Sequence, residues 1–217
     1  MGLKESGLRG SLRSVSTEVG AIPDSVVLQP EPNDLDHFSG DTGDFAIQDI
    51  TNFGDGDFTL KGTDADSVST IFSDSGLDAY PEPGQRLSCK IQLPDDASLA
   101  LVGFGFQDAD NGYAVGISGD DRFEIRKDFG QEVVENPTIK TDTVYFINWF
   151  WRSESPRIEA ELYEGEDADP SEDSPIETIQ FDDSEYTDGG VAIRNWRNDS
   201  DFTPDSFFAD YFIMERL

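Results

Sequence analysis

The chain has 217 residues, an apolar fraction of 36% and a formal net charge of -31. Its length allows one hydrophobic core and predicts a single globular domain, and its 16 Phe, 6 Tyr and 3 Trp exclude a disordered acidic chain. So negative a protein repels nucleic-acid phosphates and anionic lipid head groups, and no apolar run approaches the ~18 residues of a membrane span, so we expect neither nucleic-acid binding nor membrane insertion.

Residues 1–34 differ from the remainder in charge and pattern. They hold three of the fifteen cations, Lys4, Arg9 and Arg13, lack the apolar core of a signal peptide, and end in the stiff, proline-containing stretch Gln29–Asp34. We expect residues 1–34 to form an assembly arm that orders on a sister subunit or another protein, and residues 35–217 to form the globular domain. A frayed terminus is the alternative for the arm.

From Asp36 onward the chain consists of short apolar alternations separated by Gly, Asn and Asp. No window shows the helical period of about 3.6 residues, so the pattern predicts an all-β sandwich or barrel. The predicted strands are Phe45–Ile50, Phe58–Lys61, Val68–Phe72, Gln85–Leu93, Leu99–Gln107, Tyr113–Ser118, Arg122–Lys127, Val133–Glu135, Tyr145–Arg152, Arg157–Tyr163, Ile176–Phe181, Gly190–Asn195 and Phe207–Glu215.

The most apolar of these strands and the strand that follows it predict a hairpin across Ser153–Pro156. The first arm has apolar side chains on both faces, which is typical of a strand in the middle of a sheet. Core packing is the expected role of Trp149 and Trp151. The second arm alternates with a period of two. Its predicted core face is Ile158, Ala160 and Leu162, and its predicted solvent face is Arg157, Glu159, Glu161 and Tyr163.

Five segments occur in an order that is similar to the concanavalin A-like, laminin G-type jelly roll. They are Asp36–Ser39, Val102–Val115, Tyr145–Tyr163, Gly189–Arg194 and Phe208–Ile213. The resemblance implies two antiparallel sheets packed as a jelly-roll sandwich, here with an extended N-terminal arm. Because this fold carries enzymes, lectins and structural proteins, it does not decide the function.

The same resemblance implies a structural Ca²⁺ between the first and last strands. The matching positions are Asp36 and Asp210. Carboxylate oxygens are the ligands that Ca²⁺ prefers, although 30 aspartates also produce chance clusters.

Aromatic side chains near loops are the candidate sugar-binding residues. Sugars stack their apolar faces on Trp or Tyr, and neighbouring polar groups bind their hydroxyls. Trp196 lies between Arg194 and Arg197, and Tyr113 follows the turn Asn111-Gly112. We therefore predict a binding site formed by Trp196, Arg194, Arg197 and Tyr113, with a purely structural cation–π contact as the alternative for Trp196.

Catalytic arrangements are poorly supported. The strand Glu159–Glu164 resembles the E-x-D-x-x-E strand of some jelly-roll glycoside hydrolases, but its middle acid is Glu161 instead of Asp, and solvated face charges are the simpler interpretation. His37 is the only histidine, and we expect it to form no standard Ser/His/Asp triad. Cys89 is in step with Leu87 and Ile91 and is predicted to be a small core residue.

The charge has an unusual composition, with 30 Asp and 16 Glu against 10 Arg and only 5 Lys. This composition resembles proteins of halophiles that accumulate salt, and the segments Gly7–Arg13 and Ala21–Ser25 are similar to N-termini of proteins from haloarchaeal tailed viruses and proviruses. The two resemblances imply a non-enzymatic structural protein on a virion surface, which assembles through its arm and binds host surface glycans. A glycoside-active enzyme on the same fold, a haloarchaeal cell-surface carbohydrate-binding protein and a decoration protein that binds only its neighbours are the alternatives.

Overall fold

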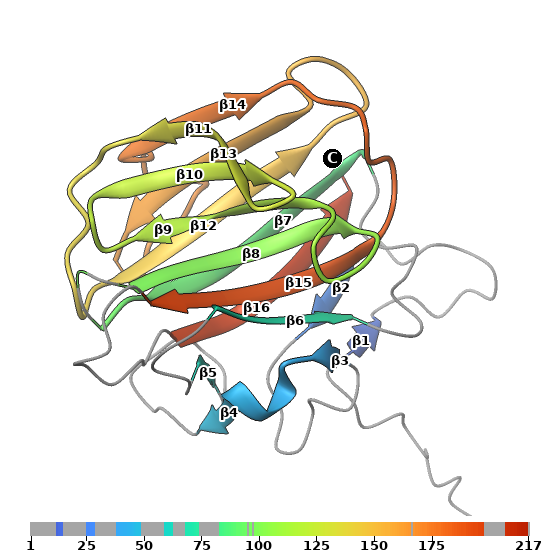
Figure 1. Cartoon of the computed structure of the whole chain (residues 1–217). Coiled ribbons are helices and arrows are strands. Elements are labelled where there is room, and N and C mark those ends of the chain that lie inside the picture. The colour runs from blue at the N-terminus through green and yellow to red at the C-terminus, as the bar shows by residue number, and fades with distance from the viewer. Residues whose placement is uncertain are drawn as a thin grey trace, which may run out of the picture.

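The computed structural model of the chain describes residues 12–14, 25–28, 38–48, 59–62, 68–73, 83–94, 96, 98–165, 167–197 and 207–216. Within these residues every element is a β-strand except the 3-10 helix Thr42–Asp44, and none of the described segments is a helix able to cross a membrane. The strands form two antiparallel sheets that pack face to face (Figure 1). The prediction of an all-β, two-sheet antiparallel sandwich is confirmed.

The first sheet has nine described strands and the second has seven. The order in the nine-stranded sheet is β1 (Leu12–Ser14), β2 (Ser25–Leu28), β16 (Phe207–Arg216), β7 (Gln85–Gln92), β12 (Val144–Trp151), β13 (Ile158–Glu164) and β14 (Glu177–Phe181), with β4 (Phe45–Gln48) on β5 (Thr59–Gly62) and β5 on β16. The order in the seven-stranded sheet is β11 (Gly130–Glu135), β10 (Arg122–Lys127), β9 (Tyr113–Ser118), β8 (Ser98–Phe106), β15 (Gly190–Arg197), β6 (Val68–Ser73) and β3 (Phe38–Gly40).

Aromatic rings fill the core between the inner faces of the two sheets. The ring centroid of Trp151 lies 5.2 Å from that of Phe104 and 6.1 Å from that of Tyr113, both with edge-to-face geometry. The largest fully buried side chains are Trp149, Trp151, Tyr113, Tyr145, Phe104 and Phe123. The predicted core roles of Trp149 and Trp151 are therefore confirmed, as is the burial of Cys89.

The predicted hairpin is present, with Trp149 of β12 opposite Ala160 of β13. Strand β12 lies in the middle of the sheet, because β7 pairs with its other edge. The one correction in β13 concerns Tyr163, which was predicted on the solvent face but is only 3% exposed. Its ring packs edge-to-face on Phe146 and its hydroxyl donates to Glu161 Oε2 at 2.9 Å, so neighbouring side chains cover it on the outer face.

Three strands lie outside those predicted from the apolar alternation. Strand β3 lies in the opening Asp36–Ser39 region, and β1 and β2 come from the predicted assembly arm. Val27 of β2 pairs with Ile213 of β16, so this part of the arm extends the nine-stranded sheet. The division of the chain at residue 34 and the role of the arm in assembly stay predictions.

The two sheets approach each other along one border of the sandwich, where β11 and β14 lie side by side (Figure 1). Strand β11 is the last strand of its sheet and pairs only with β10 among the described strands. Its exposed Glu132 and Glu135 flank the half-buried Val133 and Val134. This border is therefore lined with carboxylates.

Candidate functional site

Two of the predicted binding residues lie together on the outer face of the seven-stranded sheet. In β15, Val191 and Ile193 belong to the core between the sheets, so Arg194 and Trp196 point the other way. Both are half-buried. Trp196 and Phe129 pack on a small apolar cluster of this face, formed by Leu99, Leu101 and Ala114.

A strained turn between β10 and β11 places the ring of Phe129 on this face. Asp128 and Phe129 have φ angles of 51° and 58°, in the left-handed region that glycine favours. A bulky residue there costs on the order of 1 kcal/mol. The turn keeps the ring 5.3 Å from the ring of Phe106, with the Arg194 guanidinium carbon 3.7 Å from its centroid. The stacked pair of Phe129 and Arg194 therefore joins this turn to β15.

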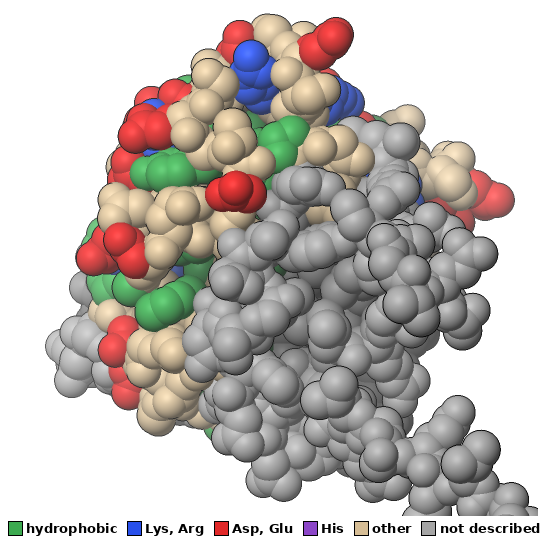
Figure 2. Space-filling model, turned by 90° about the vertical axis from the view of Figure 1, so that its right-hand side faces the viewer, with side chains coloured by type: hydrophobic (Ala, Val, Ile, Leu, Met, Phe, Trp, Pro, Cys, Tyr) green, Lys and Arg blue, Asp and Glu red, His purple; other side chains and the backbone are tan. Residues whose placement is uncertain are grey.

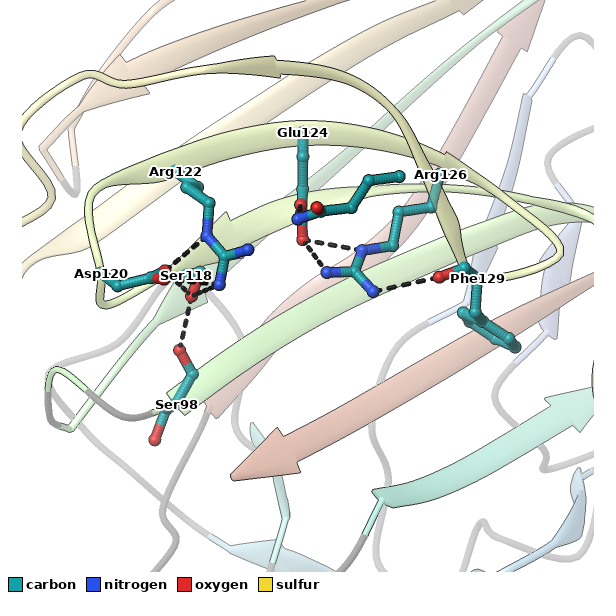
Figure 3. A network of polar contacts seen from close by, with 8 residues as sticks. Ser98, Ser118, Asp120, Arg122, Glu124, Arg126 and Phe129 are labelled. Carbon is teal, nitrogen blue, oxygen red and sulfur yellow. Dashed lines mark hydrogen bonds and ion pairs between the residues drawn. The ribbon is translucent and has the colours of Figure 1, made fainter. Parts of the chain in front are cut away.

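A buried ion pair between Glu124 and Arg126 on β10 adjoins Phe129 (Figure 3). Glu124 is fully buried although it lies on the outer face, and its Oε1 accepts from Arg126 Nε at 2.8 Å and Nη2 at 2.7 Å. Gln131 donates to the other oxygen at 2.6 Å, and Arg126 Nη1 donates to the carbonyl of Phe129 at 3.0 Å. Because Glu124 and Arg126 each form more than one hydrogen bond, their ion pair supports the turn that carries Phe129.

The same polar row continues along β10 towards the β9–β10 turn (Figure 3). Arg122 Nε donates to Asp120 at 2.6 Å, and Ser118 Oγ donates to the same carboxylate. The outer face therefore combines an apolar floor, two aromatic rings and a row of guanidinium groups.

Arg194 lies in a partly desolvated position. Burial lowers the pKa of Arg194 to about 10, and the positive charge of Arg126 acts in the same direction, while Asp110 and Asp41 oppose the shift. A pKa near 10 still leaves the guanidinium protonated at neutral pH. Arg194 is therefore a cation that is only partly hydrated.

The structure does not bring Tyr113 to this face. Its ring is fully buried between the sheets, and its hydroxyl donates to Asp183 Oδ1 at 2.5 Å. The phenol oxygen of Tyr113 also accepts from the backbone N–H of Tyr186 at 3.2 Å. Burial, and then the hydrogen bond to Asp183, raise the pKa of Tyr113 well above its ordinary value. Tyr113 therefore fastens the chain after β14 to the core.

The remaining predicted site residues are not open to description. Asp36 lies outside the described residues, and so do the side chains of Arg197 and Asp210, whose backbones belong to β15 and β16. Among the side chains that are described, no three His, Cys, Asp or Glu residues are grouped so that they could hold a metal ion. The calcium site at Asp36 and Asp210 therefore stays a prediction.

The two carboxylates of the alternative, enzymatic interpretation lie on the outer face of the other sheet. Glu159 accepts from Arg152 Nη2 at 2.7 Å and from the amide of Gln180. Glu161 accepts from Asn148 Nδ2 at 3.2 Å and from the hydroxyl of Tyr163. Both are thus bound to neighbouring side chains, on the opposite side of the sandwich from Trp196.

Asp183 is expected to stabilise the fold as an ionised acceptor. Burial alone would raise its pKa, but hydrogen bonds from Lys127 and Tyr113 outweigh it and hold the pKa of Asp183 below its ordinary value. We expect Asp183→Asn to lower the free energy of unfolding by about 1–3 kcal/mol at pH 7, measured by chemical denaturation. Since the folded-state pKa is depressed, the contribution is present above the unfolded pKa of an aspartate and is lost as the pH falls through the folded value.

Asp188→Asn is the matched control for this change. It also removes one negative charge, from an exposed side chain in the same connection. It should leave the free energy of unfolding nearly unchanged, and equal losses for the two variants would contradict the role of Asp183.

No protein-family model matches the chain, and no curated protein matches it by sequence. Solved structures do match it. A Lotus tetragonolobus seed lectin is 10% identical, with a TM-score of 0.53 over 83% of this chain and 92% of the lectin. A Parabacteroides distasonis protein that is provisionally named a glycosyl hydrolase is 13% identical, with a TM-score of 0.53 over 89% of this chain and 99% of that one.

A third similar structure is the exoplasmic/lumenal domain of VIP36 in a Ca²⁺- and Man3GlcNAc-bound form. It is 7% identical, with a TM-score of 0.53 over 89% of this chain and 90% of that domain. At such low identities the three similarities establish the fold alone. The chain therefore has the concanavalin A-like jelly-roll fold, the architecture that it shares with these lectin and glycosyl hydrolase structures.

Proposed function

We propose that this protein is a carbohydrate-binding β-sandwich whose ligand lies on the outer face of the seven-stranded sheet. The observation that carries the proposal is the position of Trp196, a half-buried indole on the same face as the guanidinium of Arg194. An aromatic face takes the apolar C–H side of a sugar ring, and a neighbouring guanidinium donates to its oxygens. The second ring, Phe129, lies on the same apolar cluster.

The similar structures support a sugar as the ligand class. One of them is named a lectin, and another was determined with a Man3GlcNAc glycan and Ca²⁺. Binding is proposed instead of hydrolysis because Glu159 and Glu161 lie away from Trp196 and are occupied by donors of the protein itself. Glu124, on the Trp196 face, is likewise held by Arg126 and Gln131.

The sequence is the basis for a proposal about where the protein works. We propose, from the acidic composition and the N-terminal segment, a structural component of a haloarchaeal virion surface that assembles through residues 1–34 and contacts host glycans. A haloarchaeal cell-surface carbohydrate-binding protein is the alternative, and the fold and the site described above serve either setting equally.

The test is binding of the full chain to a glycan array in molar KCl, followed by calorimetry with the best ligand. Trp196→Leu keeps an apolar side chain on Leu99 and Leu101 but removes the ring. By analogy with stacking on other flat ligands, we expect this change to weaken binding by about 1–3 kcal/mol. A melting curve checks that the variant is folded.

Phe150→Leu is the matched control, because Phe150 is also a half-buried ring but lies on the outer face of the nine-stranded sheet. It should leave the affinity unchanged. A folded protein that binds no glycan overturns the proposal. Loss of binding in Phe150→Leu together with full binding in Trp196→Leu would move the site to the other sheet.

A further inference from the structure

We infer that the ligand of this face is an acidic glycan, whose carboxylate or sulfate group is bound by the guanidinium of Arg194. The inference rests on the proposed function and specifies its ligand class. It follows from the way in which the structure satisfies the charges of its other basic side chains.

Most basic side chains in the described part of the chain have a carboxylate partner within ion-pair distance. The pairs are Arg122–Asp120, Arg126–Glu124, Lys127–Asp183, Lys140–Glu164 and Arg152–Glu159. No described carboxylate forms such a pair with Arg194, on which Asp110 and Asp41 act only at longer range. Among the described side chains Arg194 therefore has no carboxylate in contact, although the chain has 46 acidic and 15 basic residues.

The strand register places no carboxylate residue directly opposite Arg194, although the Asp41 carboxylate accepts from the backbone N–H of Thr70 at 3.0 Å. Arg194 of β15 lies opposite Leu101 of β8 and Thr70 of β6, so its cross-strand neighbours are an apolar residue and a hydroxyl residue. Its contact with Phe129 is a stack on the aromatic ring, at 3.7 Å from the guanidinium carbon to the centroid. A stack of this kind uses the flat face of the guanidinium and leaves the five N–H donors along its edge for acceptors.

The described residues supply no hydrogen-bond acceptor to those donors. A partly desolvated cation without acceptors is unfavourable, and a ligand oxyanion would provide both charge and acceptors. A carboxylate or sulfate presents paired oxygens that match the guanidinium fork, whereas a sugar hydroxyl offers one weaker acceptor. The position therefore favours an acidic sugar over a neutral one.

A second guanidinium reinforces the preference. Arg126 reaches the same turn, where it donates to the carbonyl of Phe129 at 3.0 Å, and its charge contributes to the lowered pKa of Arg194. Glu124 neutralises only one of the two cations. Of the two guanidinium groups next to Phe129, only that of Arg126 has a carboxylate in contact, while Asp110 and Asp41 act on Arg194 at longer range.

The overall negative charge does not prevent such binding in concentrated salt. The Debye length falls to about 3 Å at 1 M, so the distant carboxylates are screened. A hydrogen-bonded contact between the half-buried Arg194 and a ligand oxyanion is screened much less than pairs of exposed charges. The same negative charge also suppresses nonspecific adsorption of polyanions to the rest of the surface.

The experiment compares the affinity of the full chain for matched polysaccharides in molar KCl. Dextran sulfate is compared with dextran, and polygalacturonate with its methyl ester. We expect the charged member of at least one pair to bind about tenfold tighter or more. The pair that shows the difference identifies sulfate or carboxylate as the recognised group. Arg194→Gln should abolish the difference, and Arg194→Lys, which keeps the charge but not the fork, should retain part of it.

Arg152→Gln is the control for a change in total charge. Arg152 also lies over an aromatic ring, Phe150 at 4.9 Å, but on the nine-stranded sheet, so its removal should leave the preference intact. Equal affinities for charged and neutral members in the wild-type protein overturn the inference while the proposed function stands, and this comparison needs no variant. Binding to no glycan in either class overturns the proposed function itself. A preference that survives in folded Arg194→Gln assigns charge recognition to another residue and also overturns the inference.

Discussion

The melting temperature of this protein is expected to rise steeply between low salt and molar KCl. At low ionic strength, the repulsion among 46 acidic side chains acts over the whole molecule, and salt confines it to near contacts. On the part of the face that Figure 2 colours by side-chain type, acidic side chains are dispersed, with few basic ones among them. The measurement is a calorimetric or circular-dichroism melt of the full chain over a series of KCl concentrations.

The acidic pH range provides the control for this salt effect. The sequence pI is about 4.1, so near pH 4 many carboxylates are protonated and the mutual repulsion is small. The dependence of the melting temperature on KCl should therefore be much weaker there than at pH 7. A flat profile at pH 7 would contradict the interpretation of the composition as halophilic.

Replacement of Trp151 by alanine is expected to remove about 3–5 kcal/mol from the free energy of unfolding. A typical domain has about 5–15 kcal/mol in all, so the loss is a large part of the total. Trp151 is 1% exposed and joins the sheets through edge contacts with Phe104 and Tyr113. It also lies against Gly105, where an added Cβ would come within 2.9 Å of the indole, so the surroundings are closely packed and leave a cavity when the ring is removed.

Denaturant unfolding at a fixed molar salt concentration measures this loss. Trp196→Ala is the comparison, because Trp196 is only half-buried and should lose clearly less stability than Trp151. A larger loss at Trp196 than at Trp151 would mean that Trp196 belongs to the core and would weaken its assignment as a sugar platform.

The sequence predicted the strands well because their side chains alternate between a core and a solvent environment. In β13 the alternation of Ile158, Ala160 and Leu162 with charged residues is reproduced directly in their burial. The failure at Tyr163 has a physical cause. The Tyr163 ring on the outer face is covered by Glu161 of the same strand and by Phe146, which only the pairing of β12 with β13 brings into contact with it.

The candidate site was predicted in part. Arg194 and Trp196 share a face because they are two residues apart on one strand. Tyr113 was grouped with them for its position near a turn. It lies on the same face of β9 as Val115 and Ile117, however, and their apolar character already indicated that this face belongs to the core. The role of Asp183 as its partner depends on a contact seventy residues away in the chain, which no local pattern shows.

The polar half of the site was missed. The alternation of Arg122, Glu124 and Arg126 with apolar residues does place these charges on one face of β10. Their relation to β15 depends on the intervening strands β8 and β9, and the long-range order of strands is not encoded in the local period. The left-handed conformation of Phe129 was equally inaccessible, since the turn contains a residue type that rarely adopts it.

The carboxylates along the border at β11 and β14 have a further consequence for the behaviour of the protein at high concentration. The free edge of a sheet is a template for pairing with a strand of another molecule, and concentrated salt removes much of the long-range repulsion that would keep two molecules apart. Glu132 and Glu135 flank the only two apolar residues of β11, so a second copy paired on this edge would bring like charges into direct contact. The short-range repulsion persists when the salt screens the rest, and it protects this edge of the protein from aggregation under the conditions in which its fold is most stable.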